Sequence, residues 1–543
     1  MYDGGFVEQD YPGFVIAGGT LMMYTGTDTD VVIPPTVTSI ISDVFKDNTD
    51  IISVTFPASV KSIGSGAFSG CSSLETVIFE SDSELETIGD NAFKGCSKLK
   101  SITIPEGVIE IGTGAFSSEG DFFREINLPS TIETLGDNIS DVFSNSTSLK
   151  NININEDNEN FYSYNGAVYN SDDVIVYSPL GKTGSYEIKA GTEAIGESAF
   201  EKSLIDYVVI PDSVEEIGKR AFYSSKLTAV SIPGSVKTIG SYAFYNSKLY
   251  SVVIEDGVET IGDSAFETCY YIQGGIKIPA SVTSIGKQAF SDRSSGFKWV
   301  YIESETAEIG NYAFDAWGTF SIYVQDNSDV QTALTSSYST YLKTTDEFVG
   351  TEKVILDTAK ETLEFDETLE LEAKIERNES TCSELSWYST NSDIASVTFD
   401  NKDSLTATVT AKTAGTVKIV AITADGVKDE CEITVQRGEN QSDFIVDEDG
   451  YITGYRGEEE NIEIPESVGD IDVIGIAESA FESNTNISSI VIPSNIKTIG
   501  KNAFSGCVYL EDVTIEEGIE TVGEGAFSGC KGIKSIELPN SII

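Results

Sequence analysis

Five of the seven cysteines share one repeated position, three residues after a phenylalanine. Thiolates could bind zinc or form disulfides, but zinc sites need closely spaced ligands and disulfides need Cα atoms within about 7 Å. No close pair occurs here, and serine or asparagine fills the position elsewhere. We therefore expect a small, inward-facing side chain that bonds to the backbone, without metal or disulfide. The positions are Cys71, Cys96, Cys269, Cys507, Cys530, Ser146, Ser203, Ser225, Ser247, Asn48 and Asn484.

The other two cysteines, Cys382 and Cys431, lie in a different part of the chain. An oxidising compartment would allow a bridge between them. Two buried thiols are the alternative, and the sequence leaves both open.

The chain has no histidine. This excludes Ser-His-Asp and Cys-His catalysis and every zinc site that needs imidazole. No nucleophile motif, cofactor loop or pair of acidic residues stands out. We predict no enzyme activity, no cofactor, and neither catalytic nor metal-binding residues.

Three short strings imitate ligand-binding loops. Gly64–Gly70 has misplaced glycines for a nucleotide loop, and Leu180–Thr183 ends like a phosphate loop but has Val176 where the first glycine belongs. Asp447–Gly450 could begin a calcium loop, but a strand follows where the final glutamate is needed. The first string belongs to a repeat, and we interpret the other two as hairpin segments.

Acidic residues outnumber basic ones by 88 to 34, a net charge of −54. This field repels nucleic acid and anionic membranes, so we predict neither as a partner. No apolar run is long enough to cross a membrane, so we expect no direct membrane insertion.

A sequence motif that ends in Phe, usually in Ala-Phe, occurs fourteen times, and most copies are 22 to 25 residues apart. A fixed period of this length indicates a solenoid, in which each coil buries its apolar side against the next. Alternation in 99–104 predicts a strand, Pro105 ends it, and Ala115-Phe116 is expected to fill the opposite side of the coil. The phenylalanines are Phe45, Phe68, Phe93, Phe116, Phe143, Phe200, Phe222, Phe244, Phe266, Phe290, Phe314, Phe481, Phe504 and Phe527.

The unit Leu-x-x-Ile-x-Ile-Pro-x-x-Val-x-x-Ile-Gly-x-x-Ala-Phe-x-x-Cys resembles the BspA-like, or Treponema-type, leucine-rich repeat. The resemblance covers roughly 14–345 and 444–543. It implies a mixed α/β solenoid of parallel strands and short helical turns. It also implies opening hairpins at 14–27 and 444–457, a hairpin insertion near 161–187 and a closing helix within 326–343.

Between Phe314 and Phe481 the period stops, and short alternating strands over 353–435 suggest a β-sandwich. The run from Trp387 to Val397, with Ala414-Gly415 later, is similar to bacterial immunoglobulin-like domains of group 2. We predict three parts: a first array over 1–347, this all-β domain over 348–437, and a second array over 438–543. The last repeat stops midway, so we expect the second array to be truncated.

Tyrosines crowd the middle coils of the first array. The repeat register places Tyr207 and Tyr250 on the outward side of strands and Tyr242 and Tyr245 beside Phe244 on the opposite wall. Tyrosine is favoured at binding surfaces, so we predict these four as ligand contacts. The alternative is that the strands merely accept exposed tyrosines.

The family resemblance implies a secreted or cell-surface bacterial protein, an adhesin that binds a host or cell-surface macromolecule. Two alternatives stay open, namely a structural spacer or coat component of the envelope and a glycan-binding module. We expect an extracellular or cell-surface location.

Overall fold

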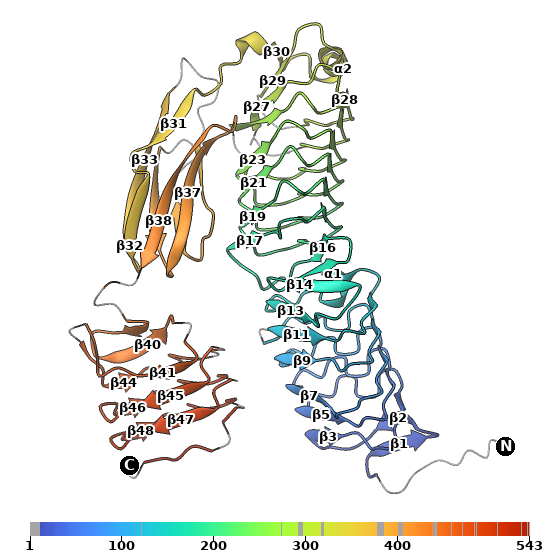
Figure 1. The fold of residues 1–543 in the computed structure, drawn as a ribbon, viewed down its shortest axis with the longest axis vertical. Helices are drawn as coiled ribbons and strands as arrows, with labels where there is room; N and C mark the ends of the chain where they lie inside the picture. The colour runs from blue at the N-terminus through green and yellow to red at the C-terminus, as the bar shows by residue number, and fades with distance from the viewer. Residues whose placement is uncertain are drawn as a thin grey trace, which may run out of the picture. The chain divides into compact units, whose positions relative to one another are not determined.

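The computed structural model describes residues 11–541, except 121, 273, 292–296, 316–319, 377–384, 400–404, 437, 439–441, 458, 470, 483, 485, 508, 531, 534 and 540. The chain divides into two compact units. The first comprises 1–359, 370–409 and 418–432, and the second comprises 360–369, 410–417 and 433–543. Each unit contains one repeat array (Figure 1).

Each coil of the first array contributes a longer strand to one side of the solenoid, which we call the strand face. These strands pair in parallel and form four successive sheets. The first two sheets contain β3 (Asp30–Val32), β5 (Ser53–Phe56), β7 (Thr76–Phe79), β9 (Ser101–Thr103), β11 (Glu125–Leu128) and β13 (Asn151–Ile154). The next two contain β17 (Ser185–Glu187), β19 (Tyr207–Val209), β21 (Ala229–Ile232), β23 (Ser251–Ile254), β25 (Gly274–Ile278), β27 (Phe297–Ile302), β29 (Ser321–Val324) and β30 (Leu342–Thr344).

A second parallel ladder, which the sequence did not predict, runs through the Ile-Gly segments. It consists mainly of two-residue strands that stack in equivalent register, such as Ile217, Ile239 and Ile261. Gly240 follows one of these isoleucines, and a Cβ there would lie 2.6 Å from the backbone of the preceding coil, so glycine is needed. The strands are β4 (Ser39–Ile40), β6 (Ser62–Ile63), β8 (Thr87–Ile88), β10 (Glu110–Ile111), β12 (Thr134–Leu135), β18 (Ala194–Ile195), β20 (Glu216–Ile217), β22 (Thr238–Ile239), β24 (Thr260–Ile261), β26 (Ser284–Ile285) and β28 (Glu308–Ile309).

The Ala-Phe segments form the remaining side, which we call the turn wall. Thirteen of the fourteen repeat phenylalanines are buried, and Phe527 is half-buried. Neighbouring rings stack in the interior, as Phe222 and Phe244 do at 5.0 Å and 5°. The prediction of an aromatic interior is therefore confirmed.

Short helical turns were expected in the turn wall, but among the described residues only α1 (Ile139–Val142), directly before Phe143, forms one there. The other helical elements of the described residues are α2 (Asp329–Tyr338) and the 3₁₀ turn η1 (Thr345–Glu347). Most wall segments instead place one residue before the alanine and a second after the phenylalanine in the left-handed region, as Asn91 and Gly95 do around Phe93. Left-handed residues interrupt a right-handed helix, and this corrects the predicted fold class.

Special elements open, interrupt and close the first array. The hairpin β1 (Phe14–Ala17) and β2 (Thr20–Tyr24) opens it, and α2 closes it, with Ser328 capping the helix through Gln331 N. The insertion contains β14 (Phe161–Tyr164), β15 (Ala167–Asn170) and β16 (Val174–Tyr177).

The second array repeats the same plan on a smaller scale (Figure 1). It opens with the antiparallel hairpin of β39 (Phe444–Val446) and β40 (Tyr451–Tyr455). The Asp447 carboxylate accepts hydrogen bonds from the N–H groups of Asp449 and Tyr451, so this loop is the hairpin turn. The other strands are β41 (Asn461–Glu463), β42 (Ser467–Val468), β43 (Ile471–Asp472), β44 (Gly475–Ile476), β45 (Ser489–Ile492), β46 (Thr498–Ile499), β47 (Asp512–Ile515) and β48 (Thr521–Val522).

Residues between the arrays form two four-stranded sheets, as the alternating pattern predicts. Their orders are β31-β33-β36-β35 and β32-β38-β37-β34. Cys382 lies outside the described residues, while Cys431 is buried. The strands are β31 (Lys353–Leu356), β32 (Lys360–Glu364), β33 (Thr368–Glu376), β34 (Leu385–Ser389), β35 (Ala395–Thr398), β36 (Thr406–Ala411), β37 (Gly415–Thr423) and β38 (Lys428–Gln436).

Candidate functional site

Tyr207 begins β19 and points outward from the solenoid, as predicted, but it meets another part of the chain. Its ring stacks on Tyr388 of β34 at 5.3 Å and 19°. Ala229 of β21 and Val420 and Ile422 of β37 are buried in the same apolar cluster. Burial raises the pKa of both tyrosines. The sandwich thus covers this part of the strand face.

Tyr250 also lies beside the sandwich. It precedes β23, its ring lies 5.3 Å from Tyr271, and it meets Phe399 edge-on at 6.3 Å. Burial raises its pKa. Ligand contact by Tyr207 and Tyr250 stays a prediction, and the structure gives both residues an aromatic neighbour from within the chain.

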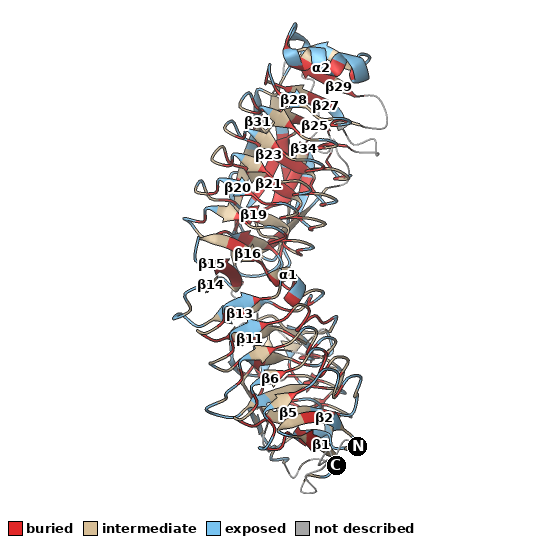
Figure 2. Ribbon diagram, turned by 90° about the vertical axis from the view of Figure 1, so that its right-hand side faces the viewer, coloured by how far each residue is buried: buried red, intermediate tan, exposed pale blue. Residues whose placement is uncertain are grey.

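Two further contacts join the sandwich to the first array. Trp299 and Tyr323 are buried in a cluster with Phe348, which follows η1, and with Ala424, which follows β37. Thr183 Oγ1 donates a hydrogen bond to the Asp393 carboxylate at 3.1 Å. Ala229 and Ser251, which begin β21 and β23, are buried, whereas the first residues of β11 and β13 are half-buried. Figure 2 accordingly shows more burial on β21 and β23 than on β13.

Tyr242 and Tyr245 lie on the turn wall of the same coils. Tyr245 stacks on Tyr223 at 5.0 Å and 8°, and Tyr242 tilts against Tyr245 at 5.7 Å. The Arg220 guanidinium lies 4.2 Å from the Tyr223 ring. We call Tyr223, Tyr242 and Tyr245 the tyrosine ladder. Tyr242 is 40% exposed, and the other two are half-buried.

Tyr223 is absent from the predicted site residues, although a signal for it exists in the sequence. Tyr223 and Tyr245 each directly follow a repeat phenylalanine, Phe222 and Phe244. Residues one period apart occupy the same place on adjacent coils, so their rings stack.

Tyr242 has an unfavourable backbone conformation for its size, with φ 60°. Glycine or asparagine occupies the same position in other coils, as at Gly66 and Asn91, because those residues enter the left-handed region easily. Tyr312 and Arg220 share the conformation. The left-handed conformation recurs at this position in most coils, so it belongs to the repeat, and Tyr242 adopts it with an unusually large side chain.

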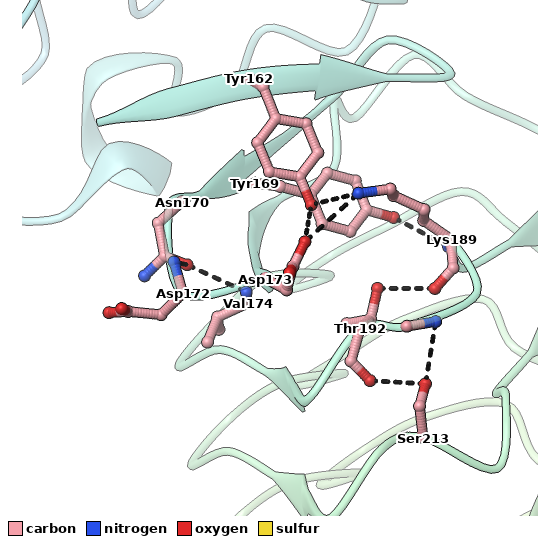
Figure 3. Close-up of polar contacts among 10 residues, drawn as sticks. Tyr162, Tyr169, Asn170, Asp172, Asp173, Val174, Lys189, Thr192 and Ser213 are labelled. Carbon is pink, nitrogen blue, oxygen red and sulfur yellow. Dashed lines mark hydrogen bonds and ion pairs between the residues drawn. The ribbon is translucent and has the colours of Figure 1, made fainter. Parts of the chain in front are cut away.

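A polar cluster fastens the insertion to the coil that follows it (Figure 3). Tyr162 donates a hydrogen bond to Asp173 at 2.6 Å, and Lys189 Nζ lies 3.0 Å from the Tyr162 hydroxyl and 3.2 Å from Asp173. The hydrogen bond from Tyr162 lowers the pKa of Asp173, and the bond to Tyr162 raises that of Lys189. Lys189 therefore stays protonated and acts as a tether, since a charged amine is no base.

The repeated cysteines have the structural role predicted for them. Each thiol donates to the carbonyl of the phenylalanine one coil earlier, as Cys71 does to Phe45 at 3.1 Å and Cys269 does to Phe244 at 3.0 Å. Ser247 donates to Phe222 in the same way at 2.7 Å. Burial raises the pKa of Cys71 to about 12, so that thiol is inert at neutral pH. No group of residues suited to hold a metal ion occurs within the described ranges.

The described part of the chain holds no helix with the length and apolar character needed to cross a membrane.

Comparison with known proteins identifies both kinds of domain. The model for the BspA type leucine-rich repeat region matches in six copies, over 22–140, 80–186, 193–322, 273–343 and 458–543. The model for the bacterial Ig-like domain of group 2 matches 351–435. A search of curated proteins gave no match.

Several solved structures are similar to this chain. A leucine-rich repeat protein from Eubacterium ventriosum is 19% identical, with a TM-score of 0.43, over 56% of this chain and 90% of that one. The pneumococcal vaccine antigen PcpA is 21% identical, with a TM-score of 0.40, over 63% and 97%. A leucine-rich cell surface protein from Faecalibacterium prausnitzii is 21% identical, with a TM-score of 0.34, over 58% and 93%.

The family matches span most of both arrays, where the stacked phenylalanines and paired strands lie. The chain belongs to the BspA-type leucine-rich repeat family and carries a bacterial Ig-like domain of group 2.

Proposed function

We propose that the chain is a secreted or cell-surface bacterial protein that binds a host or cell-surface protein through the tyrosine ladder of its first array. The surface location is supported by the repeat family and the bacterial Ig-like domain, which are binding or structural modules rather than catalytic ones. The adhesin role follows from the same resemblance.

The observation that carries the binding site is the contrast between the two sides of the same coils. Tyr207 is stacked under the sandwich, whereas Tyr242 on the opposite wall is 40% exposed. Tyrosine rings that already stack on one another lose little side-chain conformational entropy when a partner binds over them. Tyrosine is also enriched at binding hot spots. The ladder is therefore the better contact surface.

The test compares ladder variants with a matched control on the same wall. The full chain would be titrated against arrays of purified host extracellular proteins and bacterial surface proteins. Replacing Tyr223 and Tyr245 by alanine should weaken binding about tenfold or more, as loss of hot-spot side chains does.

The control is Tyr312→Ala, because Tyr312 is 64% exposed on the turn wall and has the same backbone conformation as Tyr242. It should bind like the parent chain. Equal binding by the ladder variant, with unchanged melting, would refute the ladder. Binding to no protein on either array would refute the adhesin role.

A further inference from the structure

One wall turn is missing from the first array, at the insertion. Elsewhere the N–H of each repeat phenylalanine donates to the residue before the next one, as Phe116 does to Val142 at 3.0 Å. The insertion supplies Ser178 for this role, whose N–H donates to Ala199 at 2.8 Å. Tyr177 continues the ring stack, 5.7 Å from Phe143. The coil thus keeps its interior residue but has no Ala-Phe turn.

A hollow of about 300 Å³ lies where that turn would project. Asn138, Ser144 and Asn145 line it from the preceding coil, Tyr177 lines it from the insertion, and Glu201 belongs to the coil that follows. This volume lies at the small end of the range for ligand sites. The hollow follows from the fold and not from the packing of one loop.

The charged groups around the hollow balance one another. Three carboxylates and three cationic side chains line it. Arg220 donates to both carboxylate oxygens of Glu201, at 2.9 and 3.2 Å, and Lys219 donates to Glu197 at 2.9 Å. Because the six charges cancel in number and most of them are paired, the lining has no net charge that a counter-ion must neutralise. An uncharged ligand rich in hydrogen-bonding groups fits it best.

The remaining polar groups match such a ligand. The Asn145 amide can both donate and accept, as vicinal hydroxyls require. Asn138 Oδ1 already accepts from Ser140, and Ser144 Oγ donates to Ser117 Oγ, so Asn138 offers its N–H donors and Ser144 its acceptor capacity. The Tyr177 hydroxyl has no hydrogen-bond partner among the described residues, but it is buried, so Tyr177 bounds the hollow without offering its hydroxyl to a ligand.

We infer that this hollow is a binding site for one neutral saccharide unit. The Arg220–Glu201 ion pair and the amides of Asn138 and Asn145 would bind its hydroxyl groups, and Tyr177 would border it on the side of the insertion. The site goes beyond the proposed function, because it lies at the insertion and does not require the tyrosine ladder. The saccharide would be the terminal unit of a glycan, since the hollow has room for little more.

The test uses ligand-observed NMR and calorimetry on the full chain with millimolar methyl glycosides of glucose, galactose, mannose and N-acetylglucosamine. N-acetylneuraminic acid and a neutral amino-acid amide serve as competing classes. At least one neutral glycoside should bind more tightly than either. Binding of no glycoside, or preference for the acid or the amide, would overturn the inference.

Variants then locate the binding. Asp141 is exposed and lines the hollow, so Asp141→Trp should fill it and weaken binding about tenfold or more. Asp137→Trp makes the same change of charge and size at an exposed position outside the lining, and it should bind like the parent chain. Unchanged binding by Asp141→Trp, or equal loss in both variants, would refute the site.

Glu201→Gln frees Arg220 from its carboxylate partner. The preference should then move toward N-acetylneuraminic acid by several-fold, because the lining gains a positive charge. Retention of the neutral preference would contradict the assigned role of the ion pair.

Discussion

The same coils of the first array carry tyrosines on two sides with opposite environments. On the strand face, Tyr207 and Tyr250 meet Tyr388 and Phe399 of the sandwich. On the turn wall, the tyrosine ladder stacks only along the solenoid among the contacts of the described residues. Residue type alone therefore does not distinguish a binding surface from an internal contact. The distinction depends on whether another part of the chain covers the side chain.

Removing the central ring of the covered side should have the largest effect. Tyr388→Ala deletes the side chain that stacks on Tyr207, and loss of a buried aromatic costs about 3 kcal/mol or more. Tyr388 points toward the solenoid cluster while Trp387 is buried separately, so we expect the sandwich to stay folded. Hydrogen exchange should rise in β19, β21 and β23.

The control for this experiment is the turn wall. Exchange near the tyrosine ladder should not change in Tyr388→Ala. Equal protection of β21 in the variant and the parent chain would show that the sandwich does not cover the strand face.

Alkaline pH should weaken the covered side next. Burial raises the pKa of Tyr388 above its unfolded value of about 10, so its neutral form is favoured in the folded contact. This contribution is complete below about pH 10 and is lost as the pH rises further, because the unfolded form then ionises more readily. Ultraviolet titration of the parent chain and Tyr388→Phe should differ by one late-ionising group. A difference between the two curves that develops near pH 10, before unfolding, would contradict the stacking.

On the turn wall, one substitution should increase the free energy of unfolding. Tyr242→Asn places a residue suited to the left-handed region at φ 60°, and we expect up to about 1 kcal/mol of additional stability. Chemical denaturation measures this change. If the ladder binds a partner, the same variant should bind less well, which would separate stability from function at one residue. A destabilised variant would show that the Tyr242 side chain contributes more than its backbone costs.

The interior between the two sides should be the least sensitive. Cys269→Ser keeps a donor to the Phe244 carbonyl, as Ser247 does for Phe222, so unfolding should change by less than about 1 kcal/mol. Cys269→Ala removes the donor and should cost more. Equal effects of both would mean that volume, not hydrogen bonding, selects the residue.

The interior of the solenoid could be predicted from sequence because its signals repeat. The alternation of cysteine and serine after each phenylalanine already indicates a backbone hydrogen bond, which Cys71 and Ser247 make. The second parallel ladder, through the Ile-Gly segments, was not predicted because strands of two residues are too short to show an alternation of apolar and polar residues. Helical turns were expected in every coil, although Gly66 and Asn91 before Ala-Phe are signals of left-handed backbone, and among the described wall segments only α1 is helical.

The candidate site was less predictable, since it depends on contacts that no local pattern records. Tyr207 and Tyr388 are far apart in sequence, and nothing in either segment indicates that they stack. The hollow beside Tyr177 arises from a turn that is missing, and a missing turn leaves no residues to recognise.

The backward direction of the inward hydrogen bond has a consequence for how such genes can change length. Each of the five repeated thiols, and the hydroxyls of Ser146 and Ser247, reaches the carbonyl of the coil before it, as Cys507 reaches Phe481. A duplicated unit brings both the donor its predecessor needs and the acceptor its successor needs. In-frame gain or loss of one such repeat therefore leaves the remaining coils with a donor and an acceptor for this hydrogen bond. The length of the solenoid can then change in evolution without new residues in its interior.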